Sequence, residues 1–377
     1  MKKNNSILIT GGAGFIGSNI AKKLHKKGYK VRILDNLSPQ IHGKNAHFSD
    51  ELLDIADCIK GSVTSKNDWL KALDGIDAII HLAAETGTGQ SMYEIEHYSN
   101  VNIGGTALLM DILTNNKHSI KKVIVAASRA IYGEGMYRCL EHGIVYPNER
   151  TVDNMNNGDF ECKCPKCNKT VELIPTTEDT LLHPTSIYGI TKQVQEQLVM
   201  TTCKALNIPA ISYRYQNVYG PGQSLSNPYT GILSIFSTRI LSHKSINIFE
   251  DGNETRDFVF IDDVADATIA GLENDTIKYE TFNVGSGIKT SVNEVVKELQ
   301  AAYGINVETT ISGNYRIGDI RHNFADISKL NNLLHFYPAT DFKTGIKKFA
   351  DWVKTQEIVD DKYEQSLEEM KNKGLFN

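Results

Sequence analysis

The sequence is short of several features that mark particular classes of protein. Its 377 residues carry a formal net charge of -5, so there is no basic excess to attract nucleic acid. No apolar run reaches the length that a membrane span requires. The first residues, MKKNNSILIT, pass from two lysines into a strand-like run without the apolar segment of a secretory signal. We therefore expect a cytoplasmic protein that binds neither nucleic acid nor membranes.

Strand-like and helical segments alternate along most of the chain. The runs SILIT, KVRILD, DAIIHLAA and KKVIVAAS are short, rich in branched apolar residues and followed by polar ones. Helical segments are expected over residues 18–27, 93–115 and 185–206. Buried strands that alternate with helices predict an α/β fold, with a doubly wound parallel sheet covered by helices on both faces.

A glycine-rich turn follows the first predicted strand. GGAGFIG places Gly11, Gly14 and Gly17 where the backbone must turn tightly and approach a pyrophosphate at a helix N-terminus. A tight strand–helix turn alone would explain the glycines, but Asp35 ends the second strand about twenty residues later. An acid there can bind the adenosine ribose and repels a 2′-phosphate. The pattern predicts a Rossmann-type domain that binds NAD rather than NADP.

A tyrosine and a lysine lie four residues apart near the start of a later helix. At this spacing Tyr188 and Lys192 share one helix face. A free phenol has a pKa near 10 and is a poor base at neutral pH, but a nearby ammonium and a nicotinamide cation would favour the phenolate. The spacing alone is common on helices and also fits a pair that faces solvent.

The order of these motifs resembles the extended short-chain dehydrogenase/reductase family, in the branch that modifies nucleotide-activated sugars. The resemblance covers nearly the whole chain outside one insertion. It includes HLAA, Asn102, Ser128, RYQNVYGPG, TRDFVFIDDVA, FNVGSG and RIGDIRH. It implies an NAD-dependent enzyme with a smaller C-terminal substrate-binding lobe.

The resemblance also assigns roles to residues. Tyr188 would be the general base, Ser128 would hold the reacting sugar oxygen, and Lys192 would bind the nicotinamide ribose and lower the pKa of the tyrosine. The implied cofactor contacts are Gly11, Gly14, Phe15, Ile16, Gly17, Asp35, Asn36, Val63, Leu82, Ala83, Ala84, Asn102, Tyr188 and Lys192. The implied substrate contacts are Thr86, Ser128, Asn217, Arg256 and Arg316, since guanidinium groups suit phosphate oxygens. An ion pair of Arg256 with Asp257 or Asp262, or of Arg316 with Asp319, is the simpler alternative.

Two positions depart from the family pattern. Ser62 stands where the family often has an aspartate near the adenine, which leaves the backbone of Val63 as the remaining contact. Arg129 and Ala130 follow Ser128 where 4,6-dehydratases usually carry an acidic pair that eliminates the 6-hydroxyl. The resemblance therefore implies a 4-epimerase that passes through a 4-keto sugar on a dTDP- or UDP-sugar. A 4,6-dehydratase, a decarboxylase and a non-catalytic dinucleotide-sensing protein are the alternatives.

Residues 135–178 interrupt the alternation with a polar, cysteine-bearing insertion. Cys139 and His142 form a C-x-x-H pair, and Cys164 and Cys167 a C-x-x-C pair. Together they can hold a structural zinc ion tetrahedrally. Cys162 is a rival ligand, and a loop with reduced thiols or a regulatory disulfide is an alternative. The insertion resembles that of the dTDP-L-rhamnose 4-epimerase group and could cover the sugar pocket.

The chain is expected to divide into two portions, the first of which contains this insertion. Residues 1–214 would form the NAD-binding Rossmann domain, which contains residues 135–178. Residues 215–377 would form the substrate-binding lobe, partly interleaved with the first portion, and would end in a surface helix or a frayed end. The helices over residues 93–115 and 185–206 resemble those that pair across a two-fold axis in the family, which predicts a homodimer.

Overall fold

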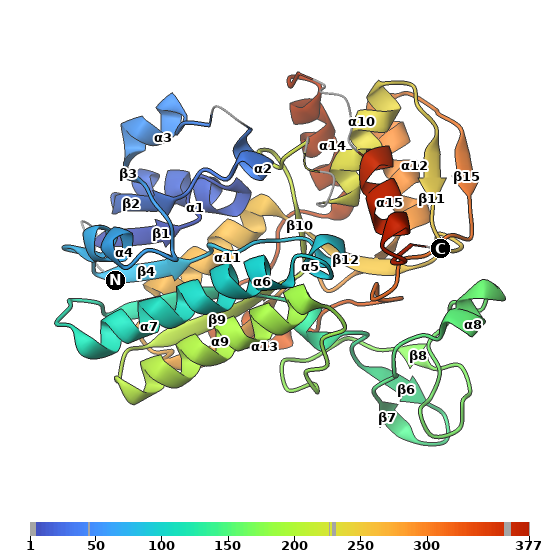
Figure 1. The fold of residues 1–377 in the computed structure, drawn as a ribbon, viewed down its shortest axis with the longest axis horizontal. Coiled ribbons are helices and arrows are strands. Elements are labelled where there is room, and N and C mark those ends of the chain that lie inside the picture. Colours follow the sequence, from blue (N-terminus) through green and yellow to red (C-terminus); the bar gives the residue numbers. More distant parts are fainter. Residues whose placement is uncertain (1–4, 44–45, 226, 228–230, 358–362, 377) are drawn as a thin grey trace.

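The large sheet has seven parallel strands in the order β13-β9-β5-β4-β1-β2-β3 (Figure 1). This arrangement is seen in a computed structural model that describes residues 5–43, 46–225, 227, 231–357 and 363–376. The strands are β1 (Ser6–Thr10), β2 (Lys30–Asp35), β3 (Ala56–Lys60), β4 (Ala78–His81), β5 (Lys122–Ser128), β9 (Ala210–Tyr215) and β13 (Tyr279–Val284). Every residue of β5 and β9 is buried, as expected for central strands covered on both sides.

Helices cover both faces of this sheet, which confirms the predicted doubly wound fold. One face packs against α1 (Phe15–Lys26), α3 (Asp50–Ile55), α11 (Ile261–Glu273) and α13 (Ser328–Leu334). The other packs against α4 (Lys66–Leu73), α7 (Gly105–Asn115) and α9 (Ile187–Ala205). The segment predicted as one helix over residues 93–115 is instead α6 (Ile95–Tyr98), a π-helix η1 (Ser99–Gly104) and α7.

The strand order reverses between β1 and β4. From β1 the chain moves outward through β2 and β3, then returns to build β4, β5, β9 and β13 on the other side. Loops on the two sides of such a reversal diverge at the carboxyl ends of the strands and leave a crevice. The short helices α2 (Pro39–His42), α5 (Thr88–Ser91) and the 3-10 helix η2 (Arg129–Tyr132) follow β2, β4 and β5 at this edge.

A smaller lobe is built mainly from later residues. Its strands are β10 (Asn217–Tyr219), β12 (Thr255–Phe260) and β14 (Lys289–Ser291), with the separate pair β11 (Ile246–Ile248) and β15 (Thr309–Ile311). Its helices are α10 (Ile232–Leu241), α12 (Val292–Tyr303) and α14 (Phe342–Val353), which share one apolar core with β11 and β12. Strand β13 from this half of the chain completes the edge of the large sheet.

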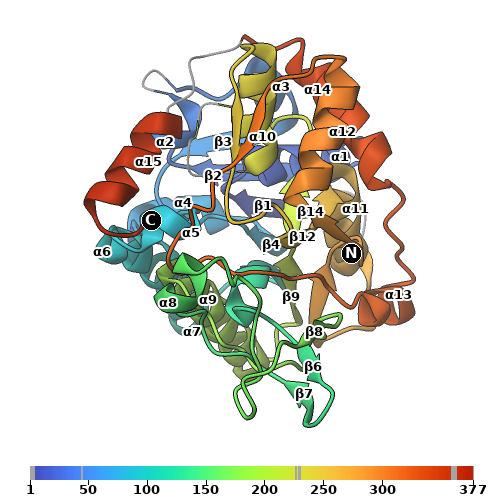
Figure 2. The ribbon, with the colours of Figure 1, turned by 90° about the vertical axis from the view of Figure 1, so that its right-hand side faces the viewer.

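The charged tail forms the helix α15 (Tyr363–Asn372), one of the two outcomes that the sequence allowed. It packs on the rest of the molecule more closely than its charge suggests, because Tyr363 and Met370 are buried. The Lys373 ammonium lies 4.6 Å from the centre of the Tyr93 ring. Figure 2 shows α15 beside α5 and α6, at the rim of the large sheet.

The insertion has a small fold of its own. Strands β6 (Tyr137–Cys139), β7 (Gly143–Val145) and β8 (Glu172–Leu173) form an antiparallel sheet. The short helix α8 (Val152–Asn156) lies between β7 and β8 in the sequence. It projects from one corner of the molecule (Figure 1). Through the described part of the chain, no helix is both long and apolar enough to cross a lipid bilayer.

Candidate active site

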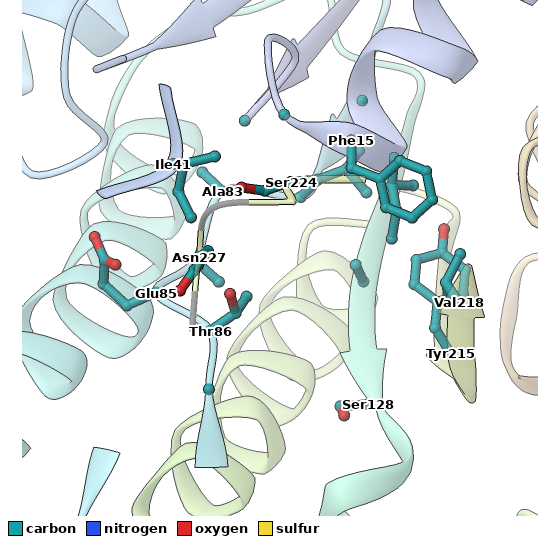
Figure 3. A pocket seen from close by; sticks show the side chains of 18 of the residues that line it. Phe15, Ile41, Ala83, Glu85, Thr86, Ser128, Tyr215, Val218, Ser224 and Asn227 are labelled. Carbon is teal, nitrogen blue, oxygen red and sulfur yellow. The ribbon is translucent and has the colours of Figure 1, made fainter. Parts of the chain in front are cut away.

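A cavity of about 540 Å³ lies at the reversal between β1 and β4. Figure 3 shows its walls, with Ser128 at the end of β5 and Thr86 on the segment after β4. All the predicted cofactor residues except Asn102 line it: Gly11, Gly14, Phe15, Ile16, Gly17, Asp35, Asn36, Val63, Leu82, Ala83, Ala84, Tyr188 and Lys192. The fold therefore brings the predicted cofactor residues and the predicted catalytic residues into one space.

The glycine turn is packed tightly enough that only glycine fits at its key positions. Gly11 has a φ of 67°, a backbone conformation that other residues rarely adopt. A Cβ on Gly17 would lie 2.4 Å from the Gly11 carbonyl oxygen. Among the described residues, no side chain caps the start of α1 at Gly14. The free N–H groups of this helix end therefore face the cavity, where a pyrophosphate can accept hydrogen bonds from them.

Asp35 joins the glycine turn to the end of β2. Its Oδ2 accepts a hydrogen bond from the Ala13 N–H at 3.0 Å, and its Oδ1 accepts one from the Leu37 N–H at 2.9 Å. His42 Nε2 lies 3.7 Å from the same carboxylate. Each carboxylate oxygen keeps a second lone pair, so Asp35 can also accept hydrogen bonds from ribose hydroxyls.

Ser62 and Val63 line the adenine end of the cavity, as the sequence suggested. The Ser62 hydroxyl is hydrogen-bonded to the Thr64 hydroxyl at 2.8 Å. Its backbone N–H donates to Asp68 Oδ2 at 2.9 Å. The carboxylate in this region thus comes from the first turn of α4 and positions the loop backbone from behind.

Asn102 lies behind the cavity wall, in the π-helix η1, and is fully buried. Its Oδ1 accepts from the Glu85 N–H at 2.7 Å, and its Nδ2 donates to the Glu85 carbonyl at 3.1 Å and to Thr191 Oγ1 at 2.9 Å. These bonds tie the loop after β4 to α9. Asn102 therefore fixes a wall of the site without facing it.

Ser128, Tyr188 and Lys192 meet at the far end of the cavity from Asp35. Ser128 ends β5, and its hydroxyl hydrogen-bonds the Tyr188 phenol. Tyr188 lies in the first turn of α9, whose N-cap is the Ser186 side chain. Lys192 follows one turn later and donates from Nζ to Gln195 Oε1. The set needed to move a proton at a sugar hydroxyl is therefore assembled on two adjoining elements.

Burial controls the acid–base state of this pair. It raises the pKa of the Tyr188 phenol above its ordinary value, and the Ser128 hydrogen bond and the Arg129 charge oppose that rise. Burial also lowers the pKa of Lys192 to about 7, against the opposing charge of Glu196. The phenol is thus protonated at neutral pH in the protein alone, and additional positive charge must arrive before it can act as a base.

The predicted substrate residues separate into two groups. Thr86, Ser128 and Asn217 line the cavity. Arg256 is held by Asp319 at 3.0 Å and by the carbonyl of Ile320, so its acidic partner is neither of the two, Asp257 and Asp262, that the simpler alternative named. Asp257 and Asp262 bind other groups, namely the backbone N–H groups of Ser286, Gly287 and Ala325, and the Lys23 ammonium.

Arg316 also lies outside the cavity lining. Its Nε is 3.9 Å from an Asp319 oxygen, and its guanidinium stacks over the Phe249 ring at 5.1 Å. The alternative ion pair with Asp319 is therefore present. Asp319 thus holds two of the arginines that the sequence assigned to phosphate binding.

Sequence analysis missed the role of Arg129 as a cavity residue. It lines the cavity, and its Nε donates to Asn217 Oδ1 at 2.8 Å. Its position directly after Ser128 in the motif was the sequence feature that could have indicated this. From the sequence, Arg129 argued against a dehydratase and was the basic residue that a decarboxylase would need to face a C6 carboxylate.

The four predicted metal ligands of the insertion lie together. The ligand atoms of Cys139, His142, Cys164 and Cys167 are all within 4.8 Å of one another. Cys139 Sγ is 3.5 Å from His142 Nδ1 and 3.7 Å from Cys167 Sγ. A tetrahedral zinc ion with Zn–S bonds near 2.3 Å separates its sulfur ligands by about 3.8 Å, so the residues present fit this ion.

The rival ligand Cys162 lies apart from this group. Its thiol donates to the Tyr137 hydroxyl at 3.3 Å, and its side chain is buried in the insertion core. Of the described residues that line the active-site cavity, none belongs to the insertion. The insertion instead contacts the segment that carries Asp319 and Arg321.

Comparison with known proteins identifies the family. The chain matches the sequence model of the NAD dependent epimerase/dehydratase family over residues 7–159 and 160–285. It is 38% identical over 350 residues to the dTDP-L-rhamnose 4-epimerase of Burkholderia thailandensis, which covers 92% of this chain and 94% of that protein. The crystal structure of the UDP-glucuronic acid 4-epimerase of Bacillus cereus, in complex with UDP-glucuronic acid and NAD, superposes with a TM-score of 0.75. Sequence identity there is 27%, over 93% of this chain and 99% of that one. The chain therefore belongs to the NAD dependent epimerase/dehydratase family.

Proposed function

We propose that this member of the NAD dependent epimerase/dehydratase family inverts C4 of a nucleoside-diphosphate sugar through a transient 4-keto sugar. One observation carries the proposal: a single cavity runs from the glycine turn and Asp35 to Ser128, Tyr188 and Lys192. A dinucleotide laid along it places its nicotinamide end beside the residues that handle the proton. The relatives that are named 4-epimerases support the same reaction.

The residues divide the chemistry between them. Ser128 holds the 4-oxygen of the sugar by a hydrogen bond, and Tyr188 removes the 4-hydroxyl proton. Lys192 holds the nicotinamide ribose. NAD, when bound, would supply the hydride acceptor and donor that the oxidation and re-reduction of C4 require. The 4-keto sugar turns within the cavity, and Tyr188 gives its proton back to the opposite alkoxide, so NAD and enzyme are unchanged.

The residues after Ser128 distinguish this reaction from dehydration. Removal of the 6-hydroxyl needs an acid and a base close to C5 and C6. Arg129 and Ala130 follow Ser128 and offer neither. Relatives named as dehydratases and decarboxylases exist within the same family, and the product of the reaction therefore remains the deciding measurement.

The first substrate to test is dTDP-L-rhamnose. The relative that shares 38% identity is a dTDP-L-rhamnose 4-epimerase, whereas the superposed crystal structure holds UDP-glucuronic acid. We infer a dTDP- or UDP-sugar. We give the deoxysugar priority because the higher identity extends over 92% of this chain.

Incubation of the purified protein with dTDP-L-rhamnose and a panel of UDP- and dTDP-sugars tests the reaction. We expect inversion at C4 by NMR with no change in mass, and no turnover in Tyr188→Phe although NAD still binds. Loss of water or carbon dioxide would replace the epimerase with a dehydratase or decarboxylase. Binding of NAD with no turnover of any sugar would favour a dinucleotide-sensing protein.

We also propose that Cys139, His142, Cys164 and Cys167 bind a structural zinc ion. Their mutual distances suit a tetrahedral ion, as described above. Burial raises the pKa of the Cys164 thiol, but the N–H groups of Lys166 and Cys167 outweigh it and lower the pKa to about 6. A thiolate is the form that ligates zinc.

Metal analysis of the purified protein tests this site with a matched pair of variants. We expect one zinc ion per chain, lost in Cys164→Ser. The buried neighbour provides the control: Cys162→Ser should keep the metal, because the Cys162 thiol bonds to Tyr137. Retention of zinc in Cys164→Ser, or its loss in Cys162→Ser, contradicts the ligand set.

A homodimer is the third proposal. Helices α7 and α9 pack side by side on one face of the sheet (Figure 1), and both continue to the surface. Exposed apolar side chains, Ile95 in α6 and Ile190 in α9, lie at this side. Light scattering during size-exclusion chromatography should give twice the mass of one chain, and Ile95→Glu should reduce it. A monomeric mass at all concentrations contradicts the dimer.

A further inference from the structure

The backbone after Ser128 packs directly on the first turn of α9. The Ser128 hydroxyl caps η2 by accepting from the Ala130 N–H at 3.2 Å. A Cβ on Gly189, the residue after Tyr188, would lie 2.6 Å from the Ala130 carbonyl oxygen. Only glycine permits this approach, so the close packing of the two elements fixes the position of Arg129 relative to Tyr188.

The Arg129 side chain is anchored at one end only. Its Nε donates to Asn217 Oδ1 at 2.8 Å. The two terminal nitrogens donate to no described residue, and neither is a buried atom without a partner. Arg129 lines the same cavity as Ser128 and Tyr188, so its terminal nitrogens can serve a group bound there. A planar guanidinium with free donors attracts anionic oxygen there.

Arg129 keeps its charge over the range in which an enzyme is assayed. Burial and the neighbouring Arg256 lower the pKa of Arg129 to about 10, while Asp319, Tyr188 and Glu134 oppose that fall. The guanidinium therefore remains a cation from about pH 6 to about pH 9. Of the charges that face it, Arg256 lies on β12, and Asp319 and Glu134 lie on the loops beside the insertion.

The other groups around Tyr188 supply less positive charge. Ser128 from β5 offers a neutral hydroxyl, and Tyr98 from α6 is a second phenol whose pKa is raised by burial and by Glu85. Lys192 from the same helix bonds to Gln195, and its pKa of about 7 makes it increasingly neutral as pH rises. Arg129 is thus the neighbour of Tyr188 whose charge persists where the phenolate is needed.

We propose that Arg129 is a positioning residue of the epimerase reaction, which stabilises the Tyr188 phenolate through space and orients the sugar together with Asn217. This inference rests on the proposed function and deepens it. Lys192 was expected both to bind the nicotinamide ribose and to lower the pKa of Tyr188, and the inference divides these two tasks between two residues. Lys192 binds the cofactor ribose, and Arg129 provides the lasting charge.

The test measures kcat and KM against pH for wild type, Arg129→Met, Arg129→Lys and Asn217→Ala, each loaded with NAD. In Arg129→Met we expect the acid limb of the kcat profile to move about one to two pH units towards alkaline, because a neighbouring unit charge that favours the phenolate is lost. Below that limb kcat should fall about ten- to a hundred-fold, and recover at high pH. Arg129→Lys should keep the wild-type limb to within about half a unit. Asn217→Ala should raise KM with the limb unmoved.

The outcomes distinguish this inference from the proposed function. An active wild type with a superimposable pH profile in Arg129→Met overturns the role of Arg129 alone. So does a uniform loss at every pH that Arg129→Lys does not rescue, because that is the signature of misplaced structure. A wild type that epimerises no sugar overturns the proposed function and this inference with it. Retained NAD binding in each variant shows that the fold is intact.

Discussion

The large sheet and the insertion are ordered by different kinds of interaction. The sheet buries aliphatic side chains on both faces, and all seven residues of β5 are buried. The insertion core consists of a tyrosine, thiols and two valines, namely Tyr137, Cys139, Val145, Cys162, Cys164 and Val171. Of its other apolar residues, Leu140 and Ile144 are exposed, whereas Met155 and Phe160 pack with Tyr315 in a second small cluster. The apolar clusters of the insertion are much smaller than those of the sheet, so burial offsets less of the entropy of ordering the chain there.

The insertion is attached to the body of the molecule by charges. Arg321 is almost completely buried and binds Glu161 of the insertion at 2.7 Å. It also binds Glu250 and Asp251 of the smaller lobe at 2.9 and 2.7 Å. Arg150 of the insertion adds a pair with Glu250 at 2.8 Å. An apolar core makes a region independent, whereas ion pairs make the order of the insertion depend on pH, and the proposed zinc site would make it depend on metal as well.

Removal of the proposed zinc ion should produce the largest difference in stability between the insertion and the sheet. Structural zinc contributes roughly 10–16 kcal/mol to the folding of isolated zinc-finger peptides. Treatment with a chelator should therefore unfold the insertion locally and leave the sheet folded. Hydrogen exchange would show it: amides of β6 and β8 should lose protection, and those of β5 and β9 should keep it. Equal loss in both regions, or in neither, contradicts the division.

Replacement of Arg321 by methionine should have the next largest effect. It leaves Glu250 and Asp251 facing each other without their shared cation, and breaking a buried pair in this way costs about 3–5 kcal/mol. Denaturant unfolding should show the loss, and proteolysis within the insertion should become faster. The exposed Arg138 on β6 provides the control, since Arg138→Met should change stability by less than about 0.5 kcal/mol. An unchanged midpoint in Arg321→Met would mean that other contacts hold the insertion.

The same contrast decides what could be predicted from the sequence. The sheet was predictable because buried strands and glycine turns act locally: the glycine turn, Asp35 and the Tyr188–Lys192 face were placed from spacing alone. The gathering of Cys139, His142, Cys164 and Cys167 was predictable for the same reason, since C-x-x-H and C-x-x-C are local patterns. The long helix over residues 93–115 was not, because its interruption by a π-turn at Asn102 depends on bonds to Glu85 and Thr191.

Long-range charge pairing was beyond the sequence. Asp319 binds Arg256, which is 63 residues away in the sequence, and lies near Arg316. No local sequence pattern predicts that one carboxylate contacts both arginines. The position of Arg129 could not be predicted either, because it lies beside Tyr188 only where η2 packs on α9. A motif names the residue after Ser128, but only the packed fold shows which way it faces.

Acid should destabilise the two regions in different pH windows. Burial lowers the pKa of His81 to about 3 from its ordinary 6.5, so this neutral imidazole stabilises the sheet above pH 6.5. That contribution is lost as pH falls from 6.5 towards 3. The hydrogen bond with His322 and the contacts with Arg321 lower the pKa of Glu161 to about 2 from its ordinary 4.5. Its stabilisation of the insertion is present above pH 4.5 and is lost as pH falls towards 2.

Trp69 gives a probe of the first window, because its ring centre lies 5.8 Å from that of His81. Fluorescence-detected unfolding should weaken from about pH 6 downwards, and His81→Gln should flatten that slope. Hydrogen exchange in the insertion should rise only below about pH 4.5, and Glu161→Gln should remove that step. A single common midpoint for both probes would mean that the two regions unfold as one unit.

Helix caps provide the smallest and most closely matched comparison. Ser65 caps α4, which packs on the sheet, and its hydroxyl accepts from the Asp68 N–H at 3.3 Å. Thr151 caps α8 in the insertion, and its hydroxyl accepts from the Asn154 N–H at the same 3.3 Å. Loss of such a cap costs about 1 kcal/mol. Ser65→Ala should lower the free energy of global unfolding by that amount. Thr151→Ala should leave it unchanged and only speed exchange within α8, because a region that opens by itself does not report on global unfolding. An equal fall in both variants would mean that the insertion folds with the sheet after all, and that its metal and ion pairs supplement a shared core.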